Sequence, residues 1–339
     1  MKKILPICAL LGFYTVSAQN NIGDLLASGL SDAERFTNAY LAPVTEGAVY
    51  NISNGWYNTA DAKPLGGFEI SIVGNISPFK NKDDKKAFVF RESDYENLQI
   101  VGGSDARTDE VLVSSGLGDI EGISVFVEDE NGLFREEFEL PAGLASEDFN
   151  FIPSGYVQAS VGLVKGLEVK ARFLPKLKFE DSAEIGLFGA GLQYEFTKLL
   201  PADKVLPIAI SAVIGYTSLN GEYDFTDTEV IEGENQRIDA SINTWAFNAV
   251  VSTKLPVINF YGGLGYITGK SETDILGTYR VQSGPFQATY EDPFSITNTV
   301  SGARANLGFK LKLGFFRLNG EYNIAEFSTA TLGINFGFR

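Results

Sequence analysis

The chain has 339 residues, carries 27 basic against 43 acidic side chains for a formal net charge of −16, and contains no histidine. The lack of histidine excludes Ser-His-Asp and Cys-His catalysis and any His-ligated metal site, and the negative charge argues against nucleic acid as a partner. Thirty-six glycines and 12% aromatic residues are typical of the alternating strands of a membrane β-barrel.

Residues 1–18 have the features of a secretory signal peptide. Lys2 and Lys3 precede an apolar run, and a small-residue cleavage site ends at Ala18, so we expect Sec-dependent export and a mature chain that begins at Gln19. Cleavage leaves 25 basic and 43 acidic side chains, a net charge of −18, and removes Cys8, the one cysteine of the chain. Disulfide and thiol chemistry are therefore not expected in the exported protein.

Residues 19–64 form an N-terminal helical and turn-rich segment. The spacing of apolar residues over 20–41 predicts two short helices, with Gly29 between them, a capping box at Ser31 to Glu34, and an end at Pro43. The aromatic residues Tyr50, Trp56 and Tyr57 follow among turn-forming residues. We expect this segment to be a plug inside the barrel; the alternative is an extension that lies on the barrel mouth.

Residues 65–339 alternate in polarity with a period of two, which predicts a transmembrane antiparallel β-barrel. The expected strands are 66–77, 156–165, 167–174, 183–197, 207–218, 241–254, 257–269, 301–313, 315–324 and 327–339. The connections alternate between tight turns and longer polar loops, as in outer-membrane barrels, and the strands exceed the usual length of roughly 5–6 residues in soluble sheets. A soluble β-sandwich is the weaker alternative.

Residues 78–155 are irregular and contain short β-like runs, among them a hairpin centred on Asn131-Gly132. Strand parity requires this region to begin and end on the same side of the membrane, so it contributes zero, two or four strands to a barrel of 10, 12 or 14. We expect 12–14 strands, because a structureless connection of this length is uncommon.

The last stretch, 301–339, sets the register of the barrel. Leu307, Phe309 and Leu311 alternate with Arg304, Lys310 and Lys312, and a charged residue facing lipid at mid-bilayer costs roughly 2–4 kcal/mol. The charged residues should therefore face the lumen. The candidate lumen-lining or binding residues are Tyr50, Trp56, Tyr57, Lys170, Arg172, Arg304, Lys310, Lys312, Arg317 and Glu321, accompanied by Glu69, Glu168 and Glu195.

These charged residues have two interpretations. They form ion pairs with one another or with the plug, or they line a locally basic path that favours anionic solutes. The acidic loops lack calcium-loop spacing, so a solvated repulsive surface is expected there, and Gly262-Gly263 is interpreted as close packing within a strand. We expect no catalytic residues, no metal site and no cofactor.

Several stretches resemble an uncharacterised outer-membrane β-barrel family of Bacteroidota. They are the Ser17-Ala18-Gln19 junction, the runs 54–60 and 64–69, and the stretch 153–175. More distantly, the layout is similar to the FadL/OmpP1 type of fatty acid transporter, which pairs an N-terminal hatch with a barrel. The Asn-Pro-Ala-Gly element of that hatch is missing here, with Ser53 to Trp56 only a loose analogue, so no binding residues carry over.

These observations predict a non-enzymatic protein of the Gram-negative outer membrane that passively transports small molecules, hydrophobic ones among them. Tyr50, Trp56 and Tyr57, together with the inward charges, would line or gate the path. The alternative is a structural, adhesive or secretion-accessory barrel that acts through its extracellular loops. The expected partners are outer-membrane lipid, the barrel-assembly machinery and a small-molecule solute.

Overall fold

The computed structural model describes residues 24–104, 108–129, 131, 133–179, 182–201, 206–224, 233–283 and 286–338. The expected signal peptide, its cleavage site and Gln19 lie outside this range. Among the described residues, no helix is both long enough and apolar enough to cross a membrane.

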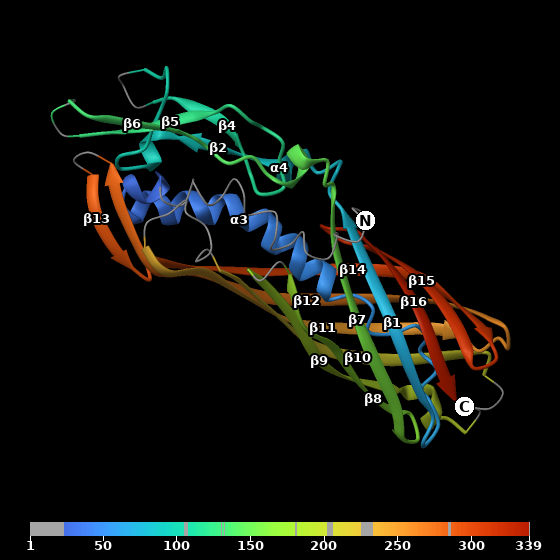
Figure 1. Cartoon of the computed structure of the whole chain (residues 1–339). Helices are drawn as coiled ribbons and strands as arrows, with labels where there is room; N and C mark the ends of the chain where they lie inside the picture. The colour runs from blue at the N-terminus through green and yellow to red at the C-terminus, as the bar shows by residue number, and fades with distance from the viewer. Residues whose placement is uncertain are drawn as a thin grey trace.

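Ten antiparallel strands form a closed barrel (Figure 1), which confirms the predicted fold class. They are β1 (Phe68–Pro78), β7 (Phe151–Val164), β8 (Leu167–Phe179), β9 (Ala183–Glu195), β10 (Ile208–Asp224), β11 (Gly233–Thr253), β12 (Ile258–Ser283), β14 (Phe294–Leu313), β15 (Phe316–Ile324) and β16 (Thr329–Phe338). The ring closes through the β1–β16 and β11–β12 pairs. The expectation of 12–14 strands was wrong, and the lowest count that parity allows is the one observed.

The two ends of the barrel differ in their connections. Phe68 pairs with Phe338, so the first strand begins where the last strand ends. The turns 165–166, 254–257 and 314–315 lie at this end, which we call the turn end. Residues 79–150 connect β1 to β7 at the opposite end, which we call the cap end.

The outer surface of the barrel is apolar. Along β1 and β16, every second residue is exposed, and the exposed residues include Ile70, Ile72, Leu332 and Ile334. The buried alternate residues are polar or small, such as Glu69, Asn75 and Asn335. This is the inverse of a soluble barrel, whose apolar side chains face inward.

Residues 79–150 are here called the cap, and in the part of it that the structure describes no strand joins the barrel. Their strands form two small sheets: β2 (Ala87–Arg91) with β4 (Glu110–Ser114), and β3 (Gln99–Ile100) with β5 (Ser124–Glu128) and β6 (Arg135–Glu139). The cap also contains α4 (Asp83–Lys86), η1 (Glu92–Asp94) and η2 (Leu144–Glu147). Strands of two to five residues are too short to span a bilayer, which needs about 9–11, and this explains why the count is ten.

One helix, α3 (Leu30–Ile52), connects the cap to the barrel. It continues through Pro43, where the sequence predicted an end, and its N-cap is Gly29 without a side-chain bond, so the capping box expected at Ser31 is not formed. Interior proline costs about 3 kcal/mol. The burial of Val44, Ala48, Val49 and Ile52 beyond it offsets that cost, because each apolar side chain gains roughly 1.5–3 kcal/mol.

The first half of α3 lies between the cap and the outer ends of the long strands, which project past the barrel at the cap end (Figure 1). β13 (Phe286–Glu291) extends this projection by pairing with β12. Leu26, Phe36 and Tyr40 share a buried core with cap residues and with strand residues such as Tyr279. The Asp32 carboxylate accepts backbone N–H bonds from residues 96–98 at 2.8, 2.8 and 3.0 Å, which ties the cap to the helix.

Candidate functional site

The interior of the barrel is occupied by the second half of α3 and by residues 53–67. We call residues 30–67 the plug. They run from the cap end, through the lumen, to the turn end, where the amide of Gly66 bonds to the carbonyl of Gly162 at 3.0 Å. Tyr50, Trp56 and Tyr57 are all buried there, with exposures of 5%, 1% and 5%.

Nearest the cap end, the contacts between plug and wall are apolar. Val49, Tyr50 and Ile52 belong to one buried cluster with wall residues that include Leu187, Ile242 and Ile267. A Cβ on Gly302 would lie 2.0 Å from the Tyr50 hydroxyl. The wall therefore uses glycine where a plug side chain comes close.

The C-terminal end of α3 lies in mid-lumen, between two arginines from opposite parts of the wall. Arg172 on β8 donates to the Ile52 carbonyl at 2.9 Å, and Arg304 on β14 donates to the Ser53 carbonyl at 3.0 Å. The last turn of α3 has no basic residue of its own. Helix C-termini carry partial negative charge and unpaired carbonyls, so these buried guanidinium groups stabilise the helix end.

Trp56 follows directly and fits a notch in the wall. Gly191 and Gly215 are opposite each other on β9 and β10, and a Cβ on Gly215 would lie 2.2 Å from the indole. On its other side, the Arg172 guanidinium lies 3.5 Å from the ring centroid. Cation–π contacts of this kind are favourable when desolvated, so the indole is held on both sides.

Tyr57 contacts the opposite wall. Its hydroxyl donates to the Asn306 side chain at 2.9 Å, and its ring meets that of Tyr261 edge-on. Glu321, on the same wall, is 7% exposed and accepts from Asn323 at 2.7 Å. These residues form the polar middle layer of the lumen.

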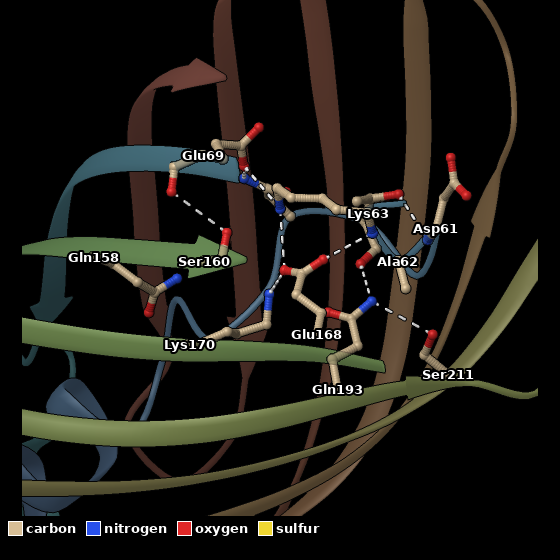
Figure 2. A network of polar contacts seen from close by, with 12 residues as sticks. Asp61, Ala62, Lys63, Glu69, Gln158, Ser160, Glu168, Lys170, Gln193 and Ser211 are labelled. Atoms are coloured by element: carbon tan, nitrogen blue, oxygen red, sulfur yellow. Dashed lines mark hydrogen bonds and ion pairs between the residues drawn. The ribbon is translucent and has the colours of Figure 1, made fainter. Parts of the chain in front are cut away.

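The turn end of the lumen contains the charged layer. The Glu69 carboxylate is 2.8 Å from Lys310, 2.6 Å from Arg317 and 3.8 Å from Lys63 of the plug. Glu168 is 3.0 Å from the same Lys63 and 2.5 Å from Lys170 (Figure 2). Lys63 thus connects two wall carboxylates through the plug.

The plug backbone is bonded to the wall as well (Figure 2). The amide of Ala62 donates to Glu195 at 2.7 Å, and the amide of Ala60 donates to Ser252 at 3.0 Å. The carbonyl of Thr59 accepts from Gln193 at 3.1 Å. Buried backbone groups need partners, and here the barrel wall supplies them.

A second set of ion pairs holds the rim at the cap end. Lys85 of α4 lies 2.8 Å from Glu46 of α3 and 3.7 Å from Glu326 in the β15–β16 turn. Lys82 lies 2.9 Å from Glu326. Cap, plug and barrel meet at this point, although ion pairs with this degree of exposure each contribute little.

The structure therefore brings the candidate residues to the interior, where most of them belong to the plug or contact it or the accompanying carboxylates. Glu321 instead accepts a hydrogen bond from Asn323, and Lys312, the most peripheral of them, donates to the Leu255 carbonyl at 3.3 Å. Sequence reasoning missed the glycine notches. Their signal was present, because Gly191, Gly215 and Gly302 occupy lumen-facing positions in otherwise regular strands.

The described residues offer no group of three or more carboxylate or thiol side chains placed to hold a metal ion. A shallow cavity of about 270 Å³ lies on the outward face near the cap end, lined by Lys176, Glu184, Glu222, Asp239 and Asp274 among others. The lumen chemistry is that of ion pairing and hydrogen bonding between plug and wall.

A model described as a family of unknown function (DUF6588) matches residues 1–338 of the chain. A comparison of the chain with curated proteins finds no match. Solved structures with some similarity include the attachment invasion locus protein Ail of Yersinia pestis, with 11% identity, coverage of 81% of this chain and 99% of that one, and a TM-score of 0.28.

Two others are the translocator domain of the autotransporter NalP from Neisseria meningitidis and the COG4313 outer membrane channel from Pseudomonas putida F1. NalP has 9% identity, coverage of 83% of this chain and 90% of that one, and a TM-score of 0.31. The channel has 10% identity, coverage of 84% and 99%, and a TM-score of 0.30. At this level of similarity, none of them supports an inference about activity.

Proposed function

We infer the role of this protein from its own geometry, because the chain belongs to a family of unknown function, DUF6588, over residues 1–338. We propose that it is an outer-membrane barrel sealed by its own N-terminal segment, and that it acts at the cell surface through its acidic cap. It is proposed to be a binding protein rather than an enzyme.

The apolar outer face supports the membrane location. Exposed Ile, Leu and Phe side chains alternate with inward, mostly polar or small ones on β1 and β16. Such a surface is unfavourable in water, since each buried apolar side chain would gain roughly 1.5–3 kcal/mol. The long loops and the cap occur at one end, and in outer-membrane barrels that end faces outward, so the turn end is assigned to the periplasm.

The observation that carries the proposal is the binding of the α3 C-terminus by Arg172 and Arg304. Both guanidinium groups are buried, with exposures of 1% and 7%, and both donate to main-chain carbonyls of the plug. Withdrawing the plug would leave two buried arginines without these acceptors. Loss of a hydrogen bond to a charged group costs about 1.5–3 kcal/mol, which opposes passive opening.

The cap is the part of the molecule best suited to a partner. Residues 79–150 contain 18 acidic and 7 basic side chains, a net charge of −11. Among the acidic residues, Glu110, Glu137 and Asp119 are exposed to about half of their full extent or more, at 56%, 48% and 55%. A surface of this sign attracts cationic partners and speeds their association.

A cap-deletion experiment tests the proposal. Pro78 pairs with Phe151, so residues 79–150 can be replaced by a short glycine-containing turn without altering the barrel register. Intact cells carrying either form are exposed to a fluorescent oligolysine probe at low and high salt. We expect salt-sensitive binding to the full-length protein and at least a several-fold loss in the cap-deleted form.

Surface amounts of the two forms are matched by a heat-shifted gel band, which reports a folded barrel. In a second variant, Glu110, Glu137 and Asp119 are replaced by the corresponding amides, which lowers the negative charge of the cap by three. The variant also loses ion pairs to Arg91, Arg135 and Lys86, but exposed pairs of this kind contribute little to stability, so the cap should stay folded. Equal probe binding by all three forms would refute a surface role for the cap.

A further inference from the structure

The turn end of the lumen carries an excess of positive charge. Four cationic side chains contact two carboxylates there, Glu69 and Glu168; the cations are Lys63, Lys170, Lys310 and Arg317. A fifth cation, Lys312, lies opposite Arg317 in the strand register. A neighbouring group is balanced, because Glu195 and Asp61 face Lys198 and Lys254. The first group is left with three positive charges in excess within the described part of the lumen.

Burial makes this excess costly. The side chains of Lys63, Lys170 and Lys310 are 7%, 5% and 3% exposed, and that of Arg317 is 14% exposed. The effective penalty for removing an unpaired charge from water is several kcal/mol. An anion bound at this place would offset that cost.

Lys312 and Arg317 mark where the anion would enter. They are directly opposite on β14 and β15, and like charges at opposed positions destabilise a strand pair. The Arg317 Nε is buried and has no hydrogen-bond partner among the described residues. The Lys312 ammonium donates to the Leu255 carbonyl at 3.3 Å, and both residues adjoin the turn 314–315 at the turn end.

We propose that the turn end of the lumen binds a phosphate group, held between Lys312 and Arg317. A guanidinium group suits tetrahedral oxyanions through paired N–H donors, and an ammonium group adds a compact charge. A dianionic phosphate would offset two of the three excess charges. The group can come from inorganic phosphate or from a phospholipid headgroup. This site rests on lumen contacts alone and does not depend on the role of the cap.

The test uses full-length protein purified in non-ionic detergent without phosphate. Inorganic phosphate is titrated at constant ionic strength, and binding is followed by the ³¹P resonance and by the Tm. We expect saturable binding and a Tm rise of several degrees in phosphate but not in chloride. Lys312→Gln should weaken binding at least tenfold, because one charge-assisted donor is lost.

The Lys312 side chain is partly exposed and donates to the Leu255 carbonyl, so its variant should fold; Arg317→Gln is a second variant. The control is Lys178→Gln, which removes a lysine that is 75% exposed near the cap end and should leave binding unchanged. Equal effects of phosphate, acetate and chloride, or unchanged binding in the Lys312 variant, would overturn the proposal.

A parallel arm distinguishes the two sources of phosphate. The protein is placed in phosphatidylglycerol or phosphatidylcholine micelles without inorganic phosphate. Stabilisation by phosphatidylglycerol that disappears in the Lys312 variant supports a lipid headgroup as the source. Stabilisation by inorganic phosphate alone supports a soluble phosphate.

Discussion

The notch for Trp56 provides a sharp test of how the plug is held. Gly215→Ala adds one methyl group, which would lie 2.2–2.4 Å from three indole atoms. Gly74→Ala is the matched control, because Gly74 is also in a barrel strand, has no positive φ and has nothing within 4 Å of an added Cβ. The two substitutions are chemically identical and differ only in what the methyl group meets.

The two substitutions should change the free energy of unfolding in opposite directions. Replacing a strand glycine with alanine gains about 0.5–1 kcal/mol from reduced chain entropy, and this gain alone applies at Gly74. At Gly215, overpacking costs about 1–3 kcal/mol. The upper part of that range applies, because the Arg172 guanidinium 3.5 Å from the ring prevents the indole from retreating. The net destabilisation should be about 2 kcal/mol.

The assay is denaturant unfolding of the refolded protein in detergent, followed by gel mobility. The indole is removed in a second background, Trp56→Ala, which itself costs about 3–5 kcal/mol. In that background Gly215→Ala should cost nothing, so the double-mutant cycle gives a coupling energy of about 2–3 kcal/mol. If Gly215→Ala behaves like Gly74→Ala, or if its penalty persists without the indole, the reasoning is refuted.

Three further predictions concern the plug and its contact with the cap. Arg304→Gln removes a buried donor to the helix end and should destabilise the barrel by about 1.5–3 kcal/mol, measured by the same unfolding assay. Asp32→Asn should increase hydrogen exchange at residues 96–98, because their backbone N–H groups donate to the Asp32 carboxylate. Unchanged exchange would contradict this. Burial, aided by the negative charge of Glu136, raises the pKa of Asp24 from 3.8 to about 6. Ionisation of Asp24 therefore destabilises the folded state as pH rises from 4 to 7. The protection of residues 24–29 against hydrogen exchange, corrected for the intrinsic exchange rate, should fall over this range. Asp24→Asn should abolish that pH dependence, and an unaltered profile would show that another group is responsible.

The barrel strands could be predicted well from the sequence because one face meets lipid and the other a polar interior. The alternation over 301–339 corresponds to β14, β15 and β16 with the same faces inward. The outer parts of β11 and β12 were missed: the sequence predicted 241–254 and 257–269, whereas the strands extend over Gly233–Thr253 and Ile258–Ser283. Beyond the membrane these strands cover α3, so lipid no longer imposes a simple alternation.

The cap and the plug were harder to predict because tertiary contacts decide them. The hairpin predicted around Asn131-Gly132 corresponds to the antiparallel pair of β5 and β6. The pairing of β2 with β4 and of β3 with β5 could not be derived from local patterns. Pro43 predicted a helix end, and burial on both sides of it overrides that signal. The inward charges were recognisable, yet their partners depend on the path of residues 53–63 through the lumen.

The central claim is that the plug seals the barrel, and single-channel recording in planar bilayers tests it most directly. The intact protein should insert without measurable conductance, whereas the Arg172→Gln/Arg304→Gln variant should show intermittent openings because the helix end has lost both donors. A steady open-channel conductance from the intact protein, equal to that of the variant, would contradict the account.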